Sequence, residues 1–372
     1  MSLDVAALSA SARRPARLAP VVAVPVRNEA ERIAELIAAL GRQSWLAGGD
    51  DVLPVVMVFN NCSDDSAVIA AAAAALDPRL ALHPVTVNFP PAVAHVGSAR
   101  RLALEVARRL LPESVDGVLL TTDADARPRA GWIEANLAAI AAGADVVGGR
   151  IVGDATEEAA LGSRFVERAR AHALYAELCD RITATIDPLD HDPLPRHHDH
   201  TGASLAVRAT AHDRVGGLPP LAFREDLAFV SRLRAAGARL RHDPAVEVEV
   251  SARTVGRAAG GMADCLRHWV DLANAEAPHL VEAPARVVAR ARLRSYLRSA
   301  GFGDGGGQDL ASLLGIPARD WRLRQADGSF RAYLVERFAP DEPDAPATMP
   351  VAEAIAELEA RLLAFEGFSH AA

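Results

Sequence analysis

The sequence predicts an α/β protein with a mainly parallel sheet and a mostly helical C-terminal extension. Over the first 150 residues, short β-rich runs alternate with helical patterns. This alternation is typical of a parallel sheet covered by helices. Beyond residue 255, helical stretches dominate. At 372 residues the chain is longer than one small domain requires, so we expect one large domain with an extension, or two domains.

The first 150 residues supply one half of the expected sheet. Its strands are residues 21–26, 55–59, 80–88, 117–122 and 145–149. The helices between them are residues 28–40, 63–76, 97–111 and 130–143. Pro84 lacks an N–H group for a ladder hydrogen bond, so its strand is expected at an edge of the sheet. Asn28 is expected to cap the first helix, with Glu31 completing a capping box.

The following residues continue the α/β pattern and then become helical. The elements expected after residue 150 are a helix over 155–182, a Pro/His/Asp-rich loop over 187–200, a strand over 201–208, a helix over 225–237 and a strand over 245–250. The last helix, from residue 351, carries one apolar face made of Ile355, Leu358, Leu362 and Phe365. We expect this face to dock on the body of the protein or on a second subunit, which makes a homodimer through the C-terminal helices one alternative.

Composition excludes several classes of protein. The net charge is −8, from 40 basic and 48 acidic residues, which does not suit nucleic-acid binding. The three cysteines lie far apart and in no metal-ligand spacing, so a reduced compartment is expected. Residues 1–19 read as a flexible lead rather than a signal peptide. No apolar run of about 18 residues predicts a transmembrane helix. A cytoplasmic protein is expected, either soluble or peripheral to a membrane through amphipathic helices.

Two polar motifs follow the first two strands. "PVRNEAE" places Asn28 where it can cap a helix, or where free N–H groups at a helix start can bind a ligand. "FNNCSDDS" places Asn60 and Asn61 in a turn or, alternatively, in a pocket for a nucleobase. Ligands of open parallel sheets bind outside the carboxyl ends of the strands, where both motifs lie.

Asp123 and Asp125 end the strand at 117–122, one residue apart. An Asp-x-Asp pair in extended chain points both carboxylates to the same side, which suits Mg²⁺ or Mn²⁺ with water and phosphate as further ligands. A polar turn before Pro128 is the alternative, and the spacing alone leaves both open.

Three further motifs carry charge or metal-binding groups. Glu225 and Asp226 start a helix, where they complement the helix dipole or supply a general base. Arg253 and Arg257 lie among glycines, as in a mobile loop that closes on phosphate or as solvated arginines. The histidines of the loop at 187–200 are expected to be solvated rather than to bind a metal. Its three clustered members are His197, His198 and His200. Of these, His200 lies directly before the "TGAS" motif.

Taken in order, these motifs resemble a family 2 glycosyltransferase with a GT-A fold. The resemblance covers residues 20 to about 260 and includes "VPVRNEAERI", "VFNNCSDDS", "GSARRLALE", "TTDADARP", "GASLAVR", "RED" and "SARTVGRAAGG". It implies a nucleotide-binding half over 20–150, an acceptor half over 151–260, and a helical extension over 261–372 that has no assigned counterpart. It also implies a nucleotide-sugar donor, an unidentified acceptor and a divalent metal, Mn²⁺ or Mg²⁺.

The resemblance gives each matching residue an expected role. Residues expected at the nucleoside end are Pro25, Arg27, Glu29 and Asn60, the last replacing a usual aspartate. Arg100 (or its neighbour Arg101) is expected to approach the donor, and Asp123 to hold the ribose or to support the metal ligand. The residues expected to line the sugar and acceptor side are Gly202, Ala203 and Ser204, and those expected to close on the phosphates are Arg253 and Arg257. Asp125 is the expected metal ligand, and Asp226 the expected catalytic base. The UDP or GDP nature of the donor stays open.

The implied reaction is a single inverting displacement. The alternatives are a retaining transferase, a nucleotidyltransferase and a non-catalytic module that binds a glycan or a partner protein. A nucleotidyltransferase would show a Gly-rich, Lys-bearing loop after the first strand, and "PVRNEAERI" has no glycine.

Overall fold

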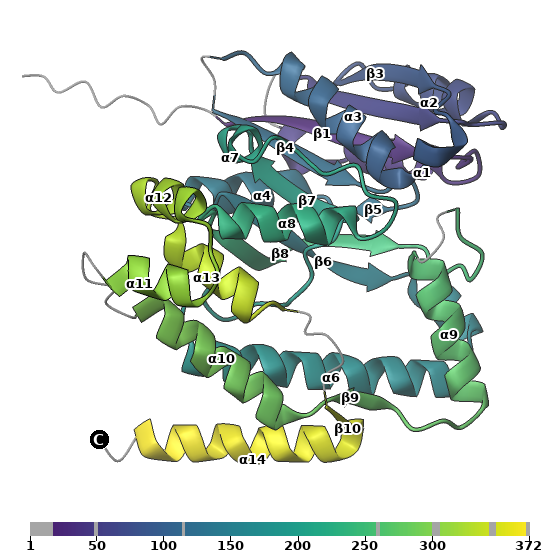
Figure 1. Ribbon diagram of the computed structural model, residues 1–372. Helices are drawn as coiled ribbons and strands as arrows, with labels where there is room; N and C mark the ends of the chain where they lie inside the picture. Colours follow the sequence, from purple (N-terminus) through teal and green to yellow (C-terminus); the bar gives the residue numbers. More distant parts are fainter. Residues whose placement is uncertain are drawn as a thin grey trace, which may run out of the picture.

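The computed structural model describes residues 18–47, 51–113, 116–257, 261–299, 306–341 and 347–369. Most of the lead expected over residues 1–19 therefore lies outside the described residues. A mixed sheet of eight strands forms the body, in the order β3-β2-β1-β4-β7-β6-β8-β5 (Figure 1). Its strands are β1 (Ala19–Val26), β2 (Leu53–Asn60), β3 (Leu80–Val87), β4 (Gly117–Thr122), β5 (Arg127–Pro128), β6 (Val146–Gly153), β7 (Ser204–Arg208) and β8 (Leu240–Val250).

Strands β1 to β4 run parallel to one another, as expected. The strand that carries Pro84, β3, lies at an edge of the sheet, which confirms the sequence prediction. β7 runs antiparallel to both β4 and β6. Its first residue, Ser204, therefore pairs with Thr122, the last residue of β4. This reversal brings the chain before β7 to the edge of the sheet where β1, β2 and β4 end.

Helices cover both faces of the sheet. The helices of the body are α1 (Ile33–Gly41), α2 (Ser66–Ala74), α3 (Val96–Leu110), α4 (Trp132–Ala141), α5 (Ala155–Ala160), α6 (Ser163–Ile186), α7 (Ala209–Arg214) and α8 (Glu225–Ala235), with short 3₁₀ turns at η1 (Ser44–Leu46) and η2 (Pro91–Val93). One core joins Val22 and Val24 of β1 to α1, α2 and α4. A second core joins Val21 and Ala23 of β1 to α3, α7 and α8. Because both faces are buried, β1 is apolar throughout, as parallel strands usually are.

The cap expected at Asn28 is wrong. The first helix begins at Ile33, after a turn in which Ile33 N donates to Glu29 O at 2.9 Å. Asn28 has a positive φ of 53°, and its Oδ1 accepts a hydrogen bond from Ser63 N at 2.8 Å. The Asn28 side chain therefore joins the loops after β1 and β2, because a long-range partner replaces the local cap.

The C-terminal extension is mostly helical, as expected. Its elements are α9 (Met262–Asn274), β9 (Leu280–Glu282), α10 (Pro284–Ser299), α11 (Gly306–Leu313), α12 (Ala318–Ala326), α13 (Phe330–Phe338), β10 (Thr348–Pro350) and α14 (Val351–Ser369). In Figure 1, α14 (yellow) lies beneath α6 and α10. Leu358 and Leu362 of α14 are buried against Leu178 and Ile182 of α6 and Val287 of α10. The apolar face of the last helix thus packs within its own chain, and the alternative of a second subunit on that face has no support.

None of the helices in the described part of the chain is both long enough and apolar enough to span a lipid bilayer.

Candidate functional site

The residues singled out in the sequence gather where β1, β2 and β4 end and β7 begins. We call this group the strand-end site and define it as Glu29, Asn60, Arg100, Asp123, Asp125, Gly202, Glu225, Asp226 and Arg253. Glu29 follows β1, Asn60 ends β2, Asp123 follows β4, and Gly202 precedes the antiparallel β7. The strand order 2-1-4-7 places these four points side by side along one edge of the sheet.

Arg100 is the buried centre of this site. Its side chain, from the first turns of α3, is 4% exposed. The guanidinium donates to Asp123 Oδ1 at 2.7 Å, to Glu225 Oε1 at 3.1 Å and to Thr121 Oγ1 at 3.0 Å. It also donates to the carbonyl oxygen of Gly202 at 2.8 Å. Arg100, rather than its neighbour Arg101, is therefore the arginine of the site. Arg101 instead pairs with Glu105 on the same helix.

Gly202 is required by the close approach of Arg100. A Cβ atom at position 202 would lie 2.4 Å from Cζ of Arg100, far inside van der Waals contact. Burial opposes the charge of Arg100, but the carboxylates of Asp123 and Glu225 raise the pKa of its guanidinium. The same burial raises the pKa of Glu225, the residue that opens α8. Glu225 is thus a structural partner of Arg100 rather than a group open to a ligand.

Asp226, the next residue, is only partly buried. Its Oδ2 accepts a hydrogen bond from Gly202 N at 2.6 Å, and its Oδ1 accepts one from Leu227 N at 2.8 Å. These bonds fix the carboxylate while leaving part of it accessible. A continuous chain of contacts therefore runs from Asp123 through Arg100 and Gly202 to Asp226.

Arg253 forms a second cationic centre. It donates to both carboxylate oxygens of Glu29, at 2.8 and 2.5 Å, and its Nη2 lies 3.0 Å from Oδ2 of Asp125. Burial, together with the charge of Asp123, raises the pKa of Asp125 to about 6. Asp125 is thus a desolvated carboxylate beside a second carboxylate, an arrangement that favours a bound cation. Arg257 lies further out and donates to the carbonyl oxygen of Asn28 at 3.0 Å.

The remaining predicted residues line the approach from β1 and β2. Pro25 lies within β1, in register with Val58 of β2. Arg27 is exposed and donates to the carbonyl oxygen of Ala94 at 2.7 Å. Asn60 is buried; its Nδ2 donates to the carbonyl oxygen of His95 at 3.3 Å, whereas its Oδ1 has no hydrogen-bond partner among the described residues. A buried amide oxygen without a partner is costly, so it marks a place where a ligand can donate.

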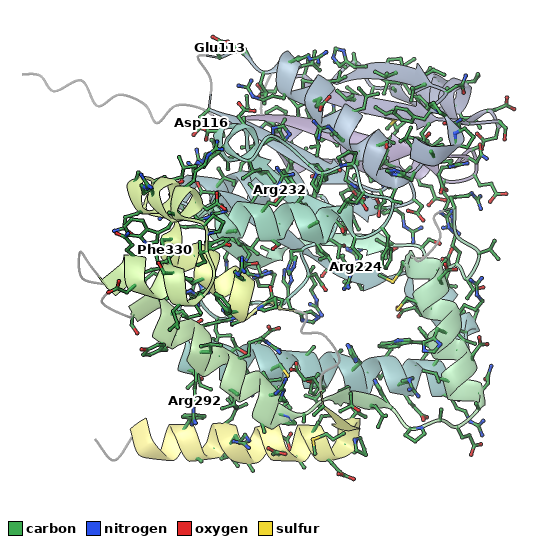
Figure 2. The ribbon with its side chains drawn as sticks, viewed as in Figure 1. Glu113, Asp116, Arg224, Arg232, Arg292 and Phe330 are labelled. Atoms are coloured by element: carbon green, nitrogen blue, oxygen red, sulfur yellow. The ribbon has the colours of Figure 1, made fainter. Side chains whose placement is uncertain are left out.

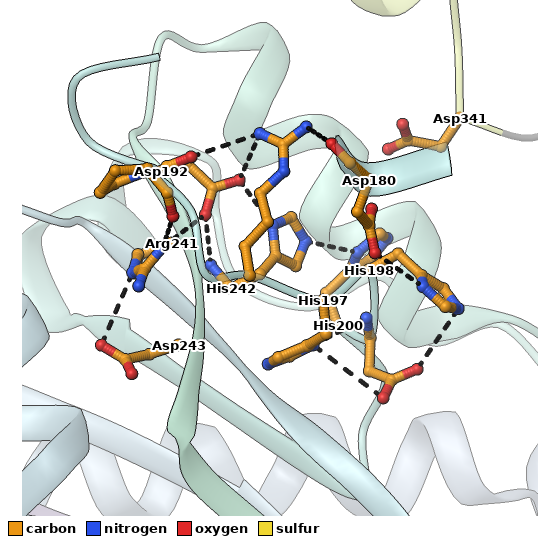
Figure 3. Close-up of polar contacts among 12 residues, drawn as sticks. Asp180, Asp192, His197, His198, His200, Arg241, His242, Asp243 and Asp341 are labelled. Atoms are coloured by element: carbon orange, nitrogen blue, oxygen red, sulfur yellow. Dashed lines mark hydrogen bonds and ion pairs between the residues drawn. The ribbon is translucent and has the colours of Figure 1, made fainter. Parts of the chain in front are cut away.

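The expectation that the histidines of the loop at 187–200 are solvated is wrong for His197 and His200. Burial, with His242 adding to the effect, lowers the pKa of both imidazoles to about 4. His200 Nδ1 lies 3.1 Å from His242 Nε2, and His242 Nδ1 lies 3.0 Å from Asp192 Oδ2 (Figure 3). His198 keeps an exposed side chain. Both His197 and His200 pack against His242 of β8, with ring centroids 5.7 and 5.3 Å from that of His242.

A metal reading of these histidines finds no support. Within the parts of the chain that the structure describes, no group of three or more His, Cys, Asp or Glu side chains is arranged to hold a metal ion.

Two residues of the site, Thr121 and Thr122, were not singled out from the sequence. Thr121 contacts Arg100. Ser204, which was expected at the site, accepts a hydrogen bond from Trp132 Nε1 at 2.9 Å, and this bond fixes the start of β7. Thr122 donates to the carbonyl oxygen of Ala203 at 2.8 Å. Only the position of the two threonines in the sequence could have indicated a role in the site, because each lies within two residues of a predicted strand-end motif.

Three solved structures illustrate the similarity to known proteins. A mannosyltransferase from Pyrobaculum calidifontis in complex with GDP-Man and Mn²⁺ is 18% identical, with 88% of each chain covered and a TM-score of 0.44. S. aureus TarS is 16% identical over 86% of this chain and 55% of its own, with a TM-score of 0.45, so this chain spans about half of it. TarS 1–349 in complex with UDP is 14% identical over 89% of this chain and 96% of its own, with a TM-score of 0.44. A search of curated proteins found no match.

Part of the chain also matches a protein-family model. Residues 21–184 match the model of glycosyl transferase family 2. The matched segment starts in β1 and ends within α6, so it includes Asn60, Arg100, Asp123 and Asp125 at their strand-end positions. This match shows that residues 21–184 are similar to glycosyl transferase family 2, and it supports a family 2 glycosyltransferase.

Proposed function

We propose that the protein transfers a sugar from a nucleoside diphosphate donor to an acceptor hydroxyl, with inversion at the anomeric carbon. One observation carries the proposal: the contacts from Asp123 through Arg100 and Gly202 to Asp226 join a carboxylate pair to a separate, accessible carboxylate. The pair suits a diphosphate with its cation. The separate carboxylate suits proton removal from an acceptor.

The donor nucleoside is assigned to the loops after β1 and β2. Asn60 Oδ1 has no partner among the described residues, so it can accept a hydrogen bond from a ring N–H of uracil or guanine. Pro25, Arg27 and Glu29 line the same end. An amide in place of a carboxylate leaves the pocket neutral at this point, and the choice between UDP and GDP rests on the binding measurement below.

A divalent cation fits the residues present. The strand-end site holds five carboxylates and two guanidinium groups, those of Arg100 and Arg253. Four of the carboxylates contact these groups, and the fifth, that of Asp226, accepts backbone N–H groups. The excess of negative charge around the desolvated Asp125 favours an oxygen-liganded cation such as Mn²⁺ or Mg²⁺. Asp125 would hold the ion, with phosphate and water completing its shell, and Asp123 would support it or the ribose. When bound, the ion offsets the charge that develops on the leaving diphosphate.

Asp226 is the proposed general base. The acceptor O–H proton passes to its carboxylate while the acceptor oxygen bonds to the anomeric carbon. The bond from that carbon to the diphosphate breaks in the same step, and the nucleoside diphosphate leaves with the electron pair. Gly202 N–H and Leu227 N–H hold the base in place. Arg253 and Arg257, on the segment after β8, are assigned to the phosphates, where their positive charge matches the leaving group.

A donor-hydrolysis screen tests the proposal. The full chain is incubated with UDP- and GDP-sugars, with Mn²⁺ or with a chelator, and nucleotide release is measured. We expect release from one nucleotide class and a large loss with the chelator. Isothermal titration of UDP and GDP with and without Mn²⁺ checks the metal separately: equal affinities in the two conditions would remove the metal from the proposal. The anomeric configuration of the product distinguishes inversion from retention.

A further inference from the structure

A cavity of about 950 Å³ lies between the body and the C-terminal extension. We call it the C-terminal cavity. Its walls are parts of α6, the loop after it, α8, β8, β9, α10 and α13. The volume lies within the range of pockets that hold small ligands. Arg100, Asp123, Asp125 and Arg253 do not line it, so it is separate from the part of the strand-end site assigned to the donor.

The cavity adjoins the proposed base. Thr201, which lines it, precedes Gly202, the residue that hydrogen-bonds Asp226. Arg224 and Leu227, which also line it, flank the Glu225–Asp226 pair at the start of α8, where Figure 2 labels Arg224. A ligand in this cavity therefore lies on a direct approach to the Asp226 carboxylate.

The charges of the cavity wall are balanced. Among the described residues, seven arginines and seven carboxylates line the cavity. The carboxylates from the C-terminal extension are all paired: Glu282 with Arg290 at 2.6 Å, Glu336 with Arg234 at 2.7 Å, and Asp341 with Arg294 at 2.7 Å. A divalent cation would have to break these pairs to find ligands.

The carboxylates from α6 and the following loop are paired as well. Asp187 pairs with Arg298, and Asp192 contacts Arg196 at 3.2 Å. Asp180 and Asp199 both contact His198, at 3.4 and 3.8 Å. An anionic ligand such as a phosphate would compete with five resident carboxylates for the arginines that these carboxylates contact, which makes the cavity a poor phosphate site.

Neutral polar groups and two aromatic side chains, those of Tyr175 and Phe223, complete the wall. His197 and His200 are neutral imidazoles, each able to donate and to accept hydrogen bonds. Phe223, three residues before Asp226, also lines the cavity, and it is 56% exposed. An exposed aromatic ring beside paired donors and acceptors matches a sugar, which has an apolar ring face and neutral hydroxyl groups.

We propose that the C-terminal cavity binds the acceptor, and that the acceptor is a neutral saccharide whose ring packs on Phe223. The inference rests on the proposed transfer reaction and adds the acceptor's site and chemical class. The charge balance of the wall disfavours phosphorylated acceptors. The many polar groups disfavour purely apolar alcohols.

The test uses the full chain and the donor found in the hydrolysis screen. Nucleotide release is compared for water alone, neutral saccharides (glucose, mannose, galactose and maltose), their 6-phosphates where these exist, and octanol. We expect stimulation by a neutral saccharide and none by its phosphate. Stimulation only by phosphates or octanol, or by none of the probes, overturns the inference while release to water still supports the proposed function. No release from any donor counts against the proposed function itself.

Variants locate the effect in the cavity. Phe223→Ala is expected to raise the saccharide KM about three- to tenfold, more than it changes kcat, because stacking contributes to binding. Phe223→Tyr keeps the ring and should restore the KM. Tyr296→Ala, on the exposed face of α10 and outside the cavity wall, is the matched control and should leave the KM unchanged. An unchanged KM in Phe223→Ala, or an equal rise in Tyr296→Ala, would contradict the placement.

Discussion

The strand-end site and the C-terminal cavity treat charge in opposite ways. The strand-end site has five carboxylates but two guanidinium groups, which contact four of them, so negative charge is in excess. In the cavity, arginines and carboxylates among the described residues are equal in number, and each carboxylate is paired. The charges of the first region are not balanced within the region, whereas the second region satisfies its own charges.

This difference in charge balance distinguishes residues expected to act in the reaction from charged residues that stabilise the fold. An excess charge costs stability and persists where a ligand or ion compensates it. Paired charges hold two parts of the chain together, as Arg298 of α10 and Asp187 at the end of α6 do. Substitutions at accessible residues of the strand-end site should therefore affect transfer, and substitutions of the paired charges in the cavity wall should affect folding.

The largest effect is expected from Asp226→Asn. The variant keeps the size of the side chain but cannot take the acceptor proton, so turnover should fall by about 10² to 10⁴. Donor affinity, measured by calorimetry, and the unfolding midpoint should change little. Glu359→Gln, an exposed carboxylate of α14, is the control for loss of one negative charge. Near-normal transfer by Asp226→Asn would take Asp226 out of the role of base.

Arg100→Met tests the contrast between the two regions, because Arg100 belongs to the strand-end site yet is buried like a structural residue. Its loss leaves Glu225, whose side chain is 5% exposed, as a buried carboxylate without its partner. The free energy of unfolding in urea should fall by about 3–5 kcal/mol. Adding Glu225→Gln should recover part of that loss, since it removes the uncompensated charge.

Arg101→Met is the matched control for Arg100→Met. Arg101 is the next residue of the same helix, but it is 36% exposed and pairs with Glu105 at its surface. Its substitution should cost less than about 1 kcal/mol. Equal losses for the two variants would show that the burial of Arg100 does not set its importance.

Leu358→Ala tests whether the apolar face of α14 stabilises the fold of its own chain. Leu358 is fully buried between α14, α6 and α10, so truncation should cost about 2–5 kcal/mol. Light scattering should give the same mass for variant and wild type. Leu363→Ala, on the exposed side of the same helix, should cost little. A change in mass with unchanged stability would instead place the apolar face in contact with a second subunit.

The strand-end site was largely predictable from sequence because position along a parallel strand is a local property. Once β1, β2 and β4 were recognised, the residues after them had to lie on one edge, and Asn60, Asp123 and Asp125 do. What could not be predicted was the partner of each charge. Arg100 contacts Glu225, which lies 125 residues later in the chain. The periodicity of the sequence cannot predict such a contact.

The C-terminal cavity was not predictable for the same reason. The loop at 187–200 has the composition of a solvated segment, but its His200 packs against His242 of β8, which lies 42 residues later in the chain. Arg298 of α10 meets Asp187 because the extension folds back across α6. Composition describes a segment by itself, whereas burial depends on what covers it.

The smallest effect is expected from Asp192→Asn in the cavity wall. Burial opposes ionisation of Asp192, but the hydrogen bond and charge of His242, aided by Arg196, lower its pKa to about 2. The folded pKa lies below the unfolded value of 3.8, so the carboxylate stabilises the fold above about pH 4. That stabilisation is lost as the pH falls towards 2. A shift of this size corresponds to roughly 2 kcal/mol at neutral pH.

Urea unfolding of wild type and Asp192→Asn at pH 7, 5, 4 and 3 measures this contribution. The difference between them should be constant from pH 7 to 5 and should shrink from pH 4 to 3, because the wild-type advantage disappears as protons bind. Asp190→Asn, two residues away and exposed, should differ from wild type by less than about 0.5 kcal/mol at every pH. If the difference for Asp192→Asn persists undiminished at pH 3, packing rather than the ion pair with His242 accounts for it. The contrast between a charge-balanced cavity and a strand-end site with excess negative charge would then lose its physical basis.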